Sequence, residues 1–237
     1  MAAIETLLFD FGGTLDADGV AWKERFHALY QAEGLNMTAE AFAPAFYAAD
    51  DSLVGALPAA AGLAGTVHAL AHGLEAELAR RAGSAGARTD GDRGRRVASR
   101  FLADAAAIFA RNRPVLEVLA KRCRLGVVSN FYGNLEAVCR SSGLAPLFKA
   151  MTDSRCVGVE KPDPAIFRAA LAELRAAPET ALFVGDSLKR DCEGARRAGL
   201  RFVWIAPEDV QAASGASAPG PVLAAVTRLP DLLEVLK

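Results

Sequence analysis

The chain has 237 residues, 52% of them hydrophobic and 23% charged, which is enough for one sizeable domain or for a core with a smaller lid. Its formal net charge of −1 argues against nucleic acid as a partner, because binding a phosphate backbone requires a basic surface. The N-terminus lacks the basic and apolar regions of a secretory signal, and no uncharged apolar run of about 18 residues indicates a membrane span, so we expect no membrane association.

The first predicted element is a short buried strand over residues 4–11, an apolar run that stops at a pair of glycines. Periodic apolar side chains then predict helices over residues 21–35, 38–53, 64–81 and 97–111. Thr38 is available as the N-cap of the second of these. Residues 82–96 are polar and rich in glycine, so we expect a mobile loop there. A further helix is expected to start at Asn112-Arg113-Pro114, since proline favours a first helical turn.

Beyond this point short strands alternate with helices. The strands are predicted over residues 124–131, 149–154, 181–187 and 200–207, and the helices over residues 133–143, 164–176 and 189–198. Such alternation is typical of a parallel sheet that has helices on both faces. We therefore predict an α/β fold in which residues 1–16 and 106–237 form the core and residues 17–105 form an inserted, all-helical cap.

Neither the histidines nor the cysteines indicate a zinc site. His68 and His72 are four residues apart on a predicted helix with Glu75 nearby, but no third ligand is apparent, so we interpret them as part of a solvated helix face. The cysteines are widely spaced and form no CxxC pair: Cys123, Cys139, Cys156 and Cys192. Free or buried thiols fit a reducing compartment, which makes the cytoplasm the expected location.

The predicted strands end in, or lead to, a set of polar side chains: Asp10, Ser129-Asn130, Lys161 and Asp186. In an open parallel sheet ligands bind at the carboxyl ends of the strands, so these distant residues are expected to converge. Two carboxylates brought together repel each other unless a cation lies between them, and hard oxygen ligands suit Mg²⁺. Asp191, five residues after Asp186, would then be a third ligand or would orient a metal-bound water.

Lys161 lies in the sequence VEKPDPAIF, where two prolines keep the backbone extended ahead of a helix. A fixed ammonium there would neutralise a phosphate that approaches a carboxylate nucleophile. Ser129 and Asn130 offer a hydroxyl and backbone N–H groups to phosphate oxygens. Each feature alone has a simpler explanation, such as a surface lysine, a strand-end turn or, for Asp186, a helix N-cap. It is their order along the chain that indicates a phosphate site.

In this order the residues resemble the four motifs of the haloacid dehalogenase (HAD) superfamily. The motifs are Asp10-Phe-Gly-Gly-Thr14-Leu, Ser129-Asn130, Lys161-Pro-Asp-Pro and Gly185-Asp186-Ser-(x)3-Asp191. The resemblance covers residues 4–18 and 112–207, and it implies a Rossmann-like core. The inserted segment matches, in position and helical character, the subgroup that has a helical C1-type cap.

The resemblance implies a mechanism and a ligand set. Asp10 would attack phosphorus in line and form an aspartyl-phosphate, which water then hydrolyses. Asp10, the backbone carbonyl of Gly12 and Asp186 would hold Mg²⁺. The other implied site residues are Ser129, Asn130 and Lys161 on the transferring phosphoryl group, and Thr14 at the edge of the site. The expected activity is hydrolysis of a small phosphorylated metabolite.

The first motif departs from the family at Gly12. Phosphatases of the family usually carry an aspartate there, as acid for the leaving group and base for the water, and such a group contributes about 10²–10⁴-fold to the rate. Glycine still offers its carbonyl to a metal but transfers no proton. We therefore expect slow turnover of ordinary monoesters or a preference for good leaving groups. A hinge residue would be a substitute acid, but we interpret the nearby polar side chains as solvated: Asp16, Asp18 and His27.

Gly12 leaves other functions open. One is a catalytically silent protein that binds a phosphorylated ligand or has a regulatory role. Another is a 2-haloacid dehalogenase, although those enzymes work without metal and generally lack the paired acids that Asp186 and Asp191 supply. A phosphonoacetaldehyde hydrolase needs a cap lysine, and the only lysine of the cap, Lys23, lies near the hinge. The sequence specifies neither the substrate nor the oligomeric state.

Overall fold

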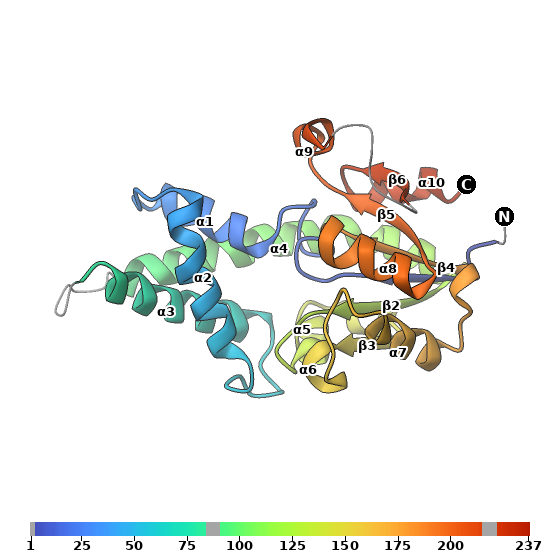
Figure 1. The fold of residues 1–237 in the computed structure, drawn as a ribbon, viewed down its shortest axis with the longest axis horizontal. Helices are drawn as coiled ribbons and strands as arrows, with labels where there is room; N and C mark the ends of the chain where they lie inside the picture. The colour runs from blue at the N-terminus through green and yellow to red at the C-terminus, as the bar shows by residue number, and fades with distance from the viewer. Residues whose placement is uncertain (1–2, 84–90, 215–221) are drawn as a thin grey trace.

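The structure, a computed structural model, describes residues 3–83, 91–214 and 222–237. Within these ranges the chain forms a six-stranded parallel sheet with the order β3-β2-β1-β4-β5-β6 (Figure 1). The strands are β1 (Thr6–Phe9), β2 (Arg124–Ser129), β3 (Ala150–Asp153), β4 (Ala181–Gly185), β5 (Arg201–Ile205) and β6 (Val222–Val226). Because β1 lies between β2 and β4, the residues that follow these three strands meet at one end of the sheet.

The predicted α/β fold is confirmed, and its helices mostly lie where periodicity placed them. They are α1 (Trp22–Ala32), α2 (Ala39–Leu53), α3 (Leu63–Arg81), α4 (Gly91–Ala120), α5 (Leu135–Ser141), α6 (Ser154–Val157), α7 (Pro164–Leu174), α8 (Glu193–Ala198), α9 (Glu208–Ala213) and α10 (Leu232–Val235). Thr38 caps α2 as predicted, because its hydroxyl accepts a hydrogen bond from the Ala41 N–H at 3.3 Å. None of the helices in the described ranges is long and apolar enough to cross a membrane.

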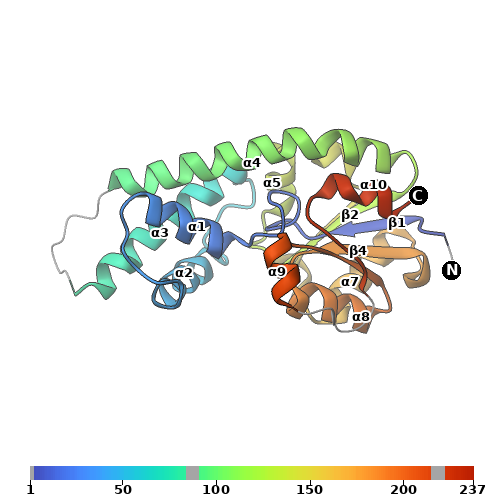
Figure 2. The ribbon, with the colours of Figure 1, turned by 90° about the horizontal axis from the view of Figure 1, so that it is seen from above.

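Helices cover both faces of the sheet (Figure 2). Successive side chains of a strand point to opposite faces, so β1 contributes to two buried clusters. Leu7 and Phe9 pack on the face covered by α4, α5 and α10. Leu8 packs on the other face, with α7 and α8. All three side chains are fully buried, which fixes β1, and the residue that follows it, at the centre of the core.

The helices α1 to α4 lie between β1 and β2 in the chain, and α4 differs from its prediction. It is one long helix that begins beside α3 and continues along the sheet (Figures 1 and 2). The predicted helix start at Asn112-Arg113-Pro114 is therefore wrong, and the expected boundary between residues 105 and 106 falls inside α4. Pro114 lacks an N–H donor, but the buried side chains of Phe101 and Leu116 anchor the helix on both sides of it. The division into core and cap stays a prediction.

The segment predicted as a mobile loop is helical in part. Residues 84–90 lie outside the described residues, whereas Gly91–Arg96 forms the start of α4. Arg93 of this segment makes a two-pronged ion pair with the buried Glu75 of α3, with both N–O distances 2.9 Å. At Arg93 the polar side chain thus serves to pair two helices rather than to solvate a loop.

The edge strand β6 was not predicted. It pairs with β5 through an irregular register between Phe202 and Val203. Two of its five residues are alanines, which have low strand propensity, and its side chains alternate between partly buried and exposed. The sequence of β6 therefore shows only a weak version of the alternating apolar pattern that predicts a strand.

Candidate active site

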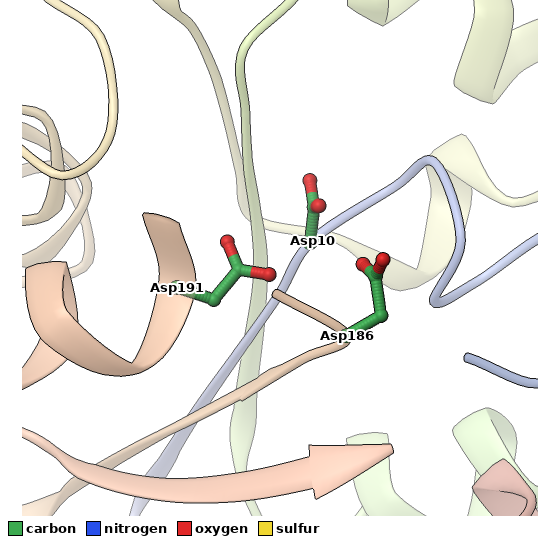
Figure 3. A group of neighbouring side chains, drawn as sticks. All are labelled: Asp10, Asp186 and Asp191. Carbon is green, nitrogen blue, oxygen red and sulfur yellow. The ribbon is translucent and has the colours of Figure 1, made fainter. Parts of the chain in front are cut away.

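The structure brings the four motifs together at the carboxyl end of the sheet. Asp10 directly follows β1, Ser129 ends β2, and Asp186 directly follows β4. Asp191 comes from a π-helical turn, Leu188–Cys192, beside β4. Figure 3 shows the carboxyl groups of Asp10, Asp186 and Asp191 turned toward one another. Lys161 reaches the same place from the loop that precedes α7.

The three carboxylates form a tight and buried acidic cluster. Each of them offers an oxygen within 4.8 Å of the others'. Burial, and then the charges of Asp191 and Asp10, raise the pKa of Asp186 well above its usual value. Burial also raises the pKa of Asp191, although Lys161 opposes that shift. Three carboxylates against the Lys161 ammonium and the Arg190 guanidinium still leave excess negative charge, so the donor set fits a divalent cation with oxygen ligands.

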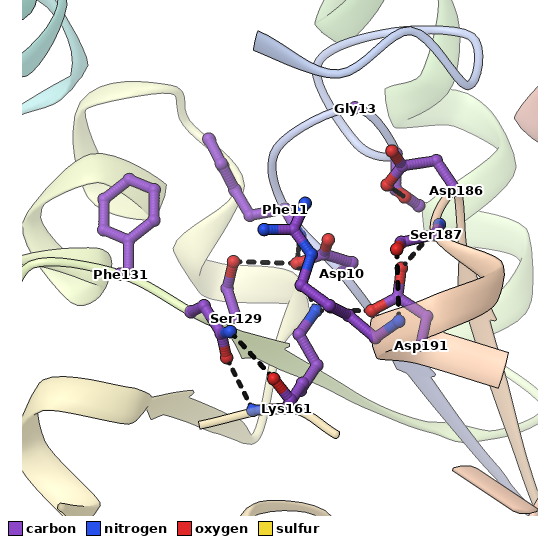
Figure 4. A network of polar contacts seen from close by, with 12 residues as sticks. Asp10, Phe11, Gly13, Ser129, Phe131, Lys161, Asp186, Ser187 and Asp191 are labelled. Carbon is purple, nitrogen blue, oxygen red and sulfur yellow. Dashed lines mark hydrogen bonds and ion pairs between the residues drawn. The ribbon is translucent and has the colours of Figure 1, made fainter. Parts of the chain in front are cut away.

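The Lys161 ammonium neutralises part of this charge (Figure 4). Its Nζ lies 2.8 Å from Asp10 Oδ1 and 2.7 Å from Asp191 Oδ1. Burial alone would lower the pKa of Lys161, but the charges of Asp10 and Asp191 raise it above its ordinary value. The side chain is almost fully buried, so it is held in one place rather than solvated.

Asn130 fixes the backbone that carries Lys161. The Lys161 N–H donates to Asn130 Oδ1 at 2.8 Å, and Asn130 Nδ2 donates to the Lys161 carbonyl at 3.1 Å. This two-way contact engages both ends of the Asn130 amide. Asn130 was predicted to help hold phosphate, and in this structure its side chain positions Lys161.

Within the described ranges, the hydrogen bonds and the ion pair of the Asp10 carboxylate involve one of its oxygens. Oδ1 accepts from the Phe11 N–H at 2.7 Å and from the Ser129 hydroxyl at 2.7 Å, and it also pairs with Lys161. Among the described residues none donates a hydrogen bond to Oδ2. The carboxylate is thus fixed through one oxygen and has the other one available for reaction or for a metal.

Asp191 is held in place by the turn that contains it. Its Oδ2 accepts a hydrogen bond from the Ser187 N–H at 3.0 Å. A Cβ at Gly185 would lie 2.4 Å from that same oxygen, so only glycine fits at the end of β4. With Oδ1 on Lys161 and Oδ2 on Ser187, both oxygens of Asp191 already have partners. This arrangement suits a residue that orients others.

Gly13 and Thr14 shape the place of Asp186. The Thr14 hydroxyl donates to Asp186 Oδ1 at 3.2 Å. Gly13 has a φ of +91°, and a Cβ on it would lie 2.7 Å from the Asp186 carboxyl carbon. Glycine is therefore required at position 13 for two reasons: the backbone has a positive φ, and the carboxyl group of Asp186 leaves no room for a side chain.

Replacing Gly13 with alanine is expected to lower the free energy of unfolding by about 2–4 kcal/mol, because it adds a steric conflict to an unfavourable backbone angle. Gly34→Ala is the matched control, since Gly34 has a φ of +87° and a Cβ on it would meet no other atom within 4 Å. Its loss should be about 1 kcal/mol, from the backbone alone. Urea denaturation measures both variants. Equal losses would contradict the close packing of Asp186 on Gly13.

Trp22 occupies the space beside Gly12. A Cβ on Gly12 would lie 3.2 Å from the indole Nε1, which itself donates to Asp16 Oδ2 at 2.7 Å. Asp16 also accepts from the Gly13 N–H at 2.8 Å and pairs with Arg25 at 2.8 Å. Burial raises the pKa of Asp16 despite these partners. The loop after β1 is thus built around a buried carboxylate and an indole.

We predicted that the polar side chains of the hinge are solvated, and this is wrong for Asp16, which is fully buried. Asp18 forms an ion pair with Arg111, and His27 Nε2 lies 2.8 Å from the Met37 carbonyl. Not one of these three residues lines the cavity beside Asp10. The hinge therefore supplies no substitute for the acid missing at Gly12.

A cavity of about 210 Å³ opens above Asp10, between the strand ends and the helices α1 and α2. The predicted site residues in its lining are Asp10, Gly12, Ser129, Asn130 and Lys161. The lining also includes residues that were not predicted for the site, among them Tyr47, Asp50, Tyr132 and Arg190. The first two lie one turn apart on α2, and Arg190 occupies a variable position of the fourth motif. The sequence shows that α2 is amphipathic but not that its polar residues face the core.

Among the described residues, His68, His72 and Glu75 do not form a group of potential metal ligands. His68 and His72 are exposed, as predicted for a solvated face, but Glu75 is buried and paired with Arg93. Within the described part of the chain, the potential metal ligands that lie close together are Asp10, Asp186 and Asp191. The four cysteines, all within the described ranges, form no disulfide.

Comparison with known proteins identifies the family. A phosphoserine phosphatase from Thermus thermophilus is 47% identical over 75 residues, which are 30% of either chain. The chain spans from 27% to 51% of the length of the curated relatives that it matches. The HAD hydrolase YfnB from Bacillus subtilis, solved with bound magnesium, has the same fold, with a TM-score of 0.59, 21% identity and 99% of both chains covered.

A 2-haloacid dehalogenase from Pseudomonas syringae is 27% identical, with a TM-score of 0.53 and 98% of both chains covered. The names of these neighbours therefore include both phosphatases and dehalogenases. The sequence model of the haloacid dehalogenase-like hydrolases matches residues 4–199, which hold every motif described above. The chain belongs to the haloacid dehalogenase-like hydrolase family.

Proposed function

We propose that the protein is an Mg²⁺-dependent phosphohydrolase that acts on a small phosphorylated metabolite through an aspartyl-phosphate at Asp10. The observation that carries this proposal is the buried cluster of three carboxylates, with Lys161 in contact with two of them, beneath a cavity. Relatives named as phosphatases support it. In this proposal residues 17–105 act as the cap over the site, and cysteines that form no disulfide fit a cytoplasmic enzyme.

Asp10, Asp186 and the carbonyl of Gly12 would hold Mg²⁺. Asp191 would orient these ligands rather than bind the metal, because both of its oxygens already have partners. When bound, Mg²⁺ would offset the charge of the acidic cluster and of the phosphoryl oxygens. The structure of the Bacillus subtilis neighbour with magnesium supports this choice of metal.

The chain's own residues account for both chemical steps. One oxygen of the Asp10 carboxylate attacks phosphorus while the bond to the leaving oxygen breaks, and Lys161 offsets the charge of the phosphoryl group. The Ser129 hydroxyl, which donates to Asp10 Oδ1 in this structure, would turn to a phosphoryl oxygen, and Asn130 keeps Lys161 in place. Water then attacks phosphorus, the bond to Asp10 breaks, and inorganic phosphate leaves.

A second candidate is a silent protein that binds a phosphorylated ligand, and the glycine at position 12 beside Trp22 favours it. Phosphate release from a panel of small phosphorylated metabolites and one acyl phosphate, with Mg²⁺ and with EDTA, separates the two. The phosphohydrolase predicts release that needs Mg²⁺. Tight binding without release from any substrate supports the silent protein. Halide release from 2-haloacids in EDTA would instead indicate a dehalogenase, the name that one structural neighbour carries.

Gly12→Asp alone is expected to change turnover little, because the indole of Trp22 crowds the new side chain at 3.2 Å. Gly12→Asp combined with Trp22→Phe should raise turnover of an alkyl phosphate at least about 10-fold over Trp22→Phe alone, since a positioned acid then fits. Steady-state phosphate release at a temperature where all variants are folded measures the change. A large gain from Gly12→Asp by itself would show that Trp22 does not restrict this position.

A further inference from the structure

The wall of the cavity carries a carboxylic acid that the motifs do not include. Asp50 lies on α2, and Tyr132 lies three residues after the end of β2. The Tyr132 hydroxyl donates a hydrogen bond to Asp50 Oδ1, and both residues line the cavity with Asp10. This contact joins an inserted helix to the strand-end loop of the core, so it fixes Asp50 relative to the acidic cluster.

The surroundings of Asp50 favour its protonated form. Burial raises the pKa of its carboxyl group above the usual value, and the neighbouring Asp51 adds to this effect. The hydrogen bond from Tyr132 and the charge of Arg190 act in the opposite direction, without cancelling the rise. These groups face Asp50 from its own helix, from the loop after β2 and from the turn after β4. A raised pKa makes a carboxylic acid better able to keep a proton for transfer to a leaving group.

The other titratable groups of the cavity wall are less suited to this role. Glu24 is exposed and paired with Lys23 at 3.1 Å. Burial raises the pKa of Tyr132 well above its usual value, so this phenol keeps its proton. Arg190 is permanently charged and donates no proton at physiological pH. Outside the motifs, Asp50 is the carboxyl group of this wall that is both partly buried and held by a hydrogen bond, which suits it to give and take a proton.

We propose that Asp50 supplies the acid–base function that Gly12 lacks, an inference that rests on the proposed function. In the first step Asp10 bonds to phosphorus, the phosphorus–oxygen bond to the leaving group breaks, and the Asp50 carboxylic acid gives its proton to that oxygen. In the second step the Asp50 carboxylate takes a proton from the attacking water, and the phosphorus–oxygen bond to Asp10 breaks. Asp50 ends protonated, ready for the next cycle.

A leaving-group series tests this role. The probes are aryl phosphates from 4-nitrophenyl phosphate, whose leaving group needs no proton, to phenyl phosphate, whose leaving group does. Asp50→Asn keeps the shape of the side chain and an oxygen for the Tyr132 hydroxyl. It should lower kcat/KM for phenyl phosphate about 10²-fold and that for 4-nitrophenyl phosphate only a few-fold. With 4-nitrophenyl phosphate, Asp50→Asn should release a burst of 4-nitrophenol before a slower steady-state rate. The burst is expected because the variant no longer activates the water that hydrolyses the aspartyl-phosphate.

The matched control is Glu40→Gln, an exposed acid of α2 that does not line the cavity, which should leave both values unchanged. Equal losses on all probes in Asp50→Asn, or no loss, would overturn the role of Asp50 while the proposed function stands. Failure of the wild type to release phosphate from any probe with Mg²⁺ would instead count against the proposed function itself.

Tyr132 is a positioning residue in this account, and its test is a pH profile. The hydrogen bond from Tyr132 lowers the pKa of Asp50, so Tyr132→Phe should raise it further. The protonated acid then persists to higher pH, and the alkaline limb of kcat/KM for phenyl phosphate should move upward. An unmoved limb would show that Asp50 does not donate the proton.

Discussion

Lys161→Met is expected to lower the free energy of unfolding by about 3–5 kcal/mol in EDTA and to abolish turnover. Methionine keeps the length of the side chain but leaves Asp10 and Asp191 without the ammonium that lies 2.8 and 2.7 Å from them. Both carboxylates are buried, so water does not replace the lost partner. Urea denaturation measures the stability, and phosphate release measures the activity.

Magnesium gives this prediction a second readout. Mg²⁺ should recover more stability in Lys161→Met than in the wild type, because the cation offsets charge that the lysine no longer neutralises. Lys149→Met serves as the control, since Lys149 is exposed and should show neither effect. Wild-type stability of Lys161→Met in EDTA would contradict the buried ion pairs.

Asp10→Asn is expected to lower turnover by about 10⁴-fold or more while the protein stays folded. Asparagine keeps an oxygen for the Phe11 and Ser129 donors but is not a nucleophile. In EDTA its unfolding temperature should equal or exceed that of the wild type, because one of three mutually repelling carboxylates is gone.

Phosphate release from acetyl phosphate and thermal unfolding in EDTA together test this separation of activity from stability. Asp18→Asn is the control on the same loop, because Asp18 pairs with Arg111 and does not line the cavity. Retention of a substantial fraction of activity in Asp10→Asn would remove Asp10 from the nucleophilic role.

The sheet and the acidic cluster follow from local patterns in the sequence. Short apolar runs that end in Asp10, Ser129 and Asp186 are strong indicators of parallel strands, and parallel topology alone makes their ends converge. The departure at Gly12 was also visible in the sequence. The sequence did not show that the indole of Trp22 occupies the space beside Gly12, because the position of Trp22 depends on how α1 packs over the loop after β1.

Contacts between distant elements explain what the sequence did not reveal. Asp50 lies on a helix whose polar positions look alike in the sequence. Its side chain faces the cavity only because α2 packs against the core. Asp16 looks like any hinge acid until Trp22 and Arg25 bury it. Pro114 predicts a helix start, yet packing on both of its sides keeps α4 continuous.

Trapping of the phosphorylated protein tests the central claim most directly. The protein is incubated with Mg²⁺ and acetyl phosphate, quenched in acid, and mapped by peptide mass spectrometry. We predict a phosphoryl group on Asp10 that requires Mg²⁺ and is absent from Asp10→Asn. Phosphate release by the wild type without any phosphoryl group on Asp10, or with the group on another residue, would contradict the account.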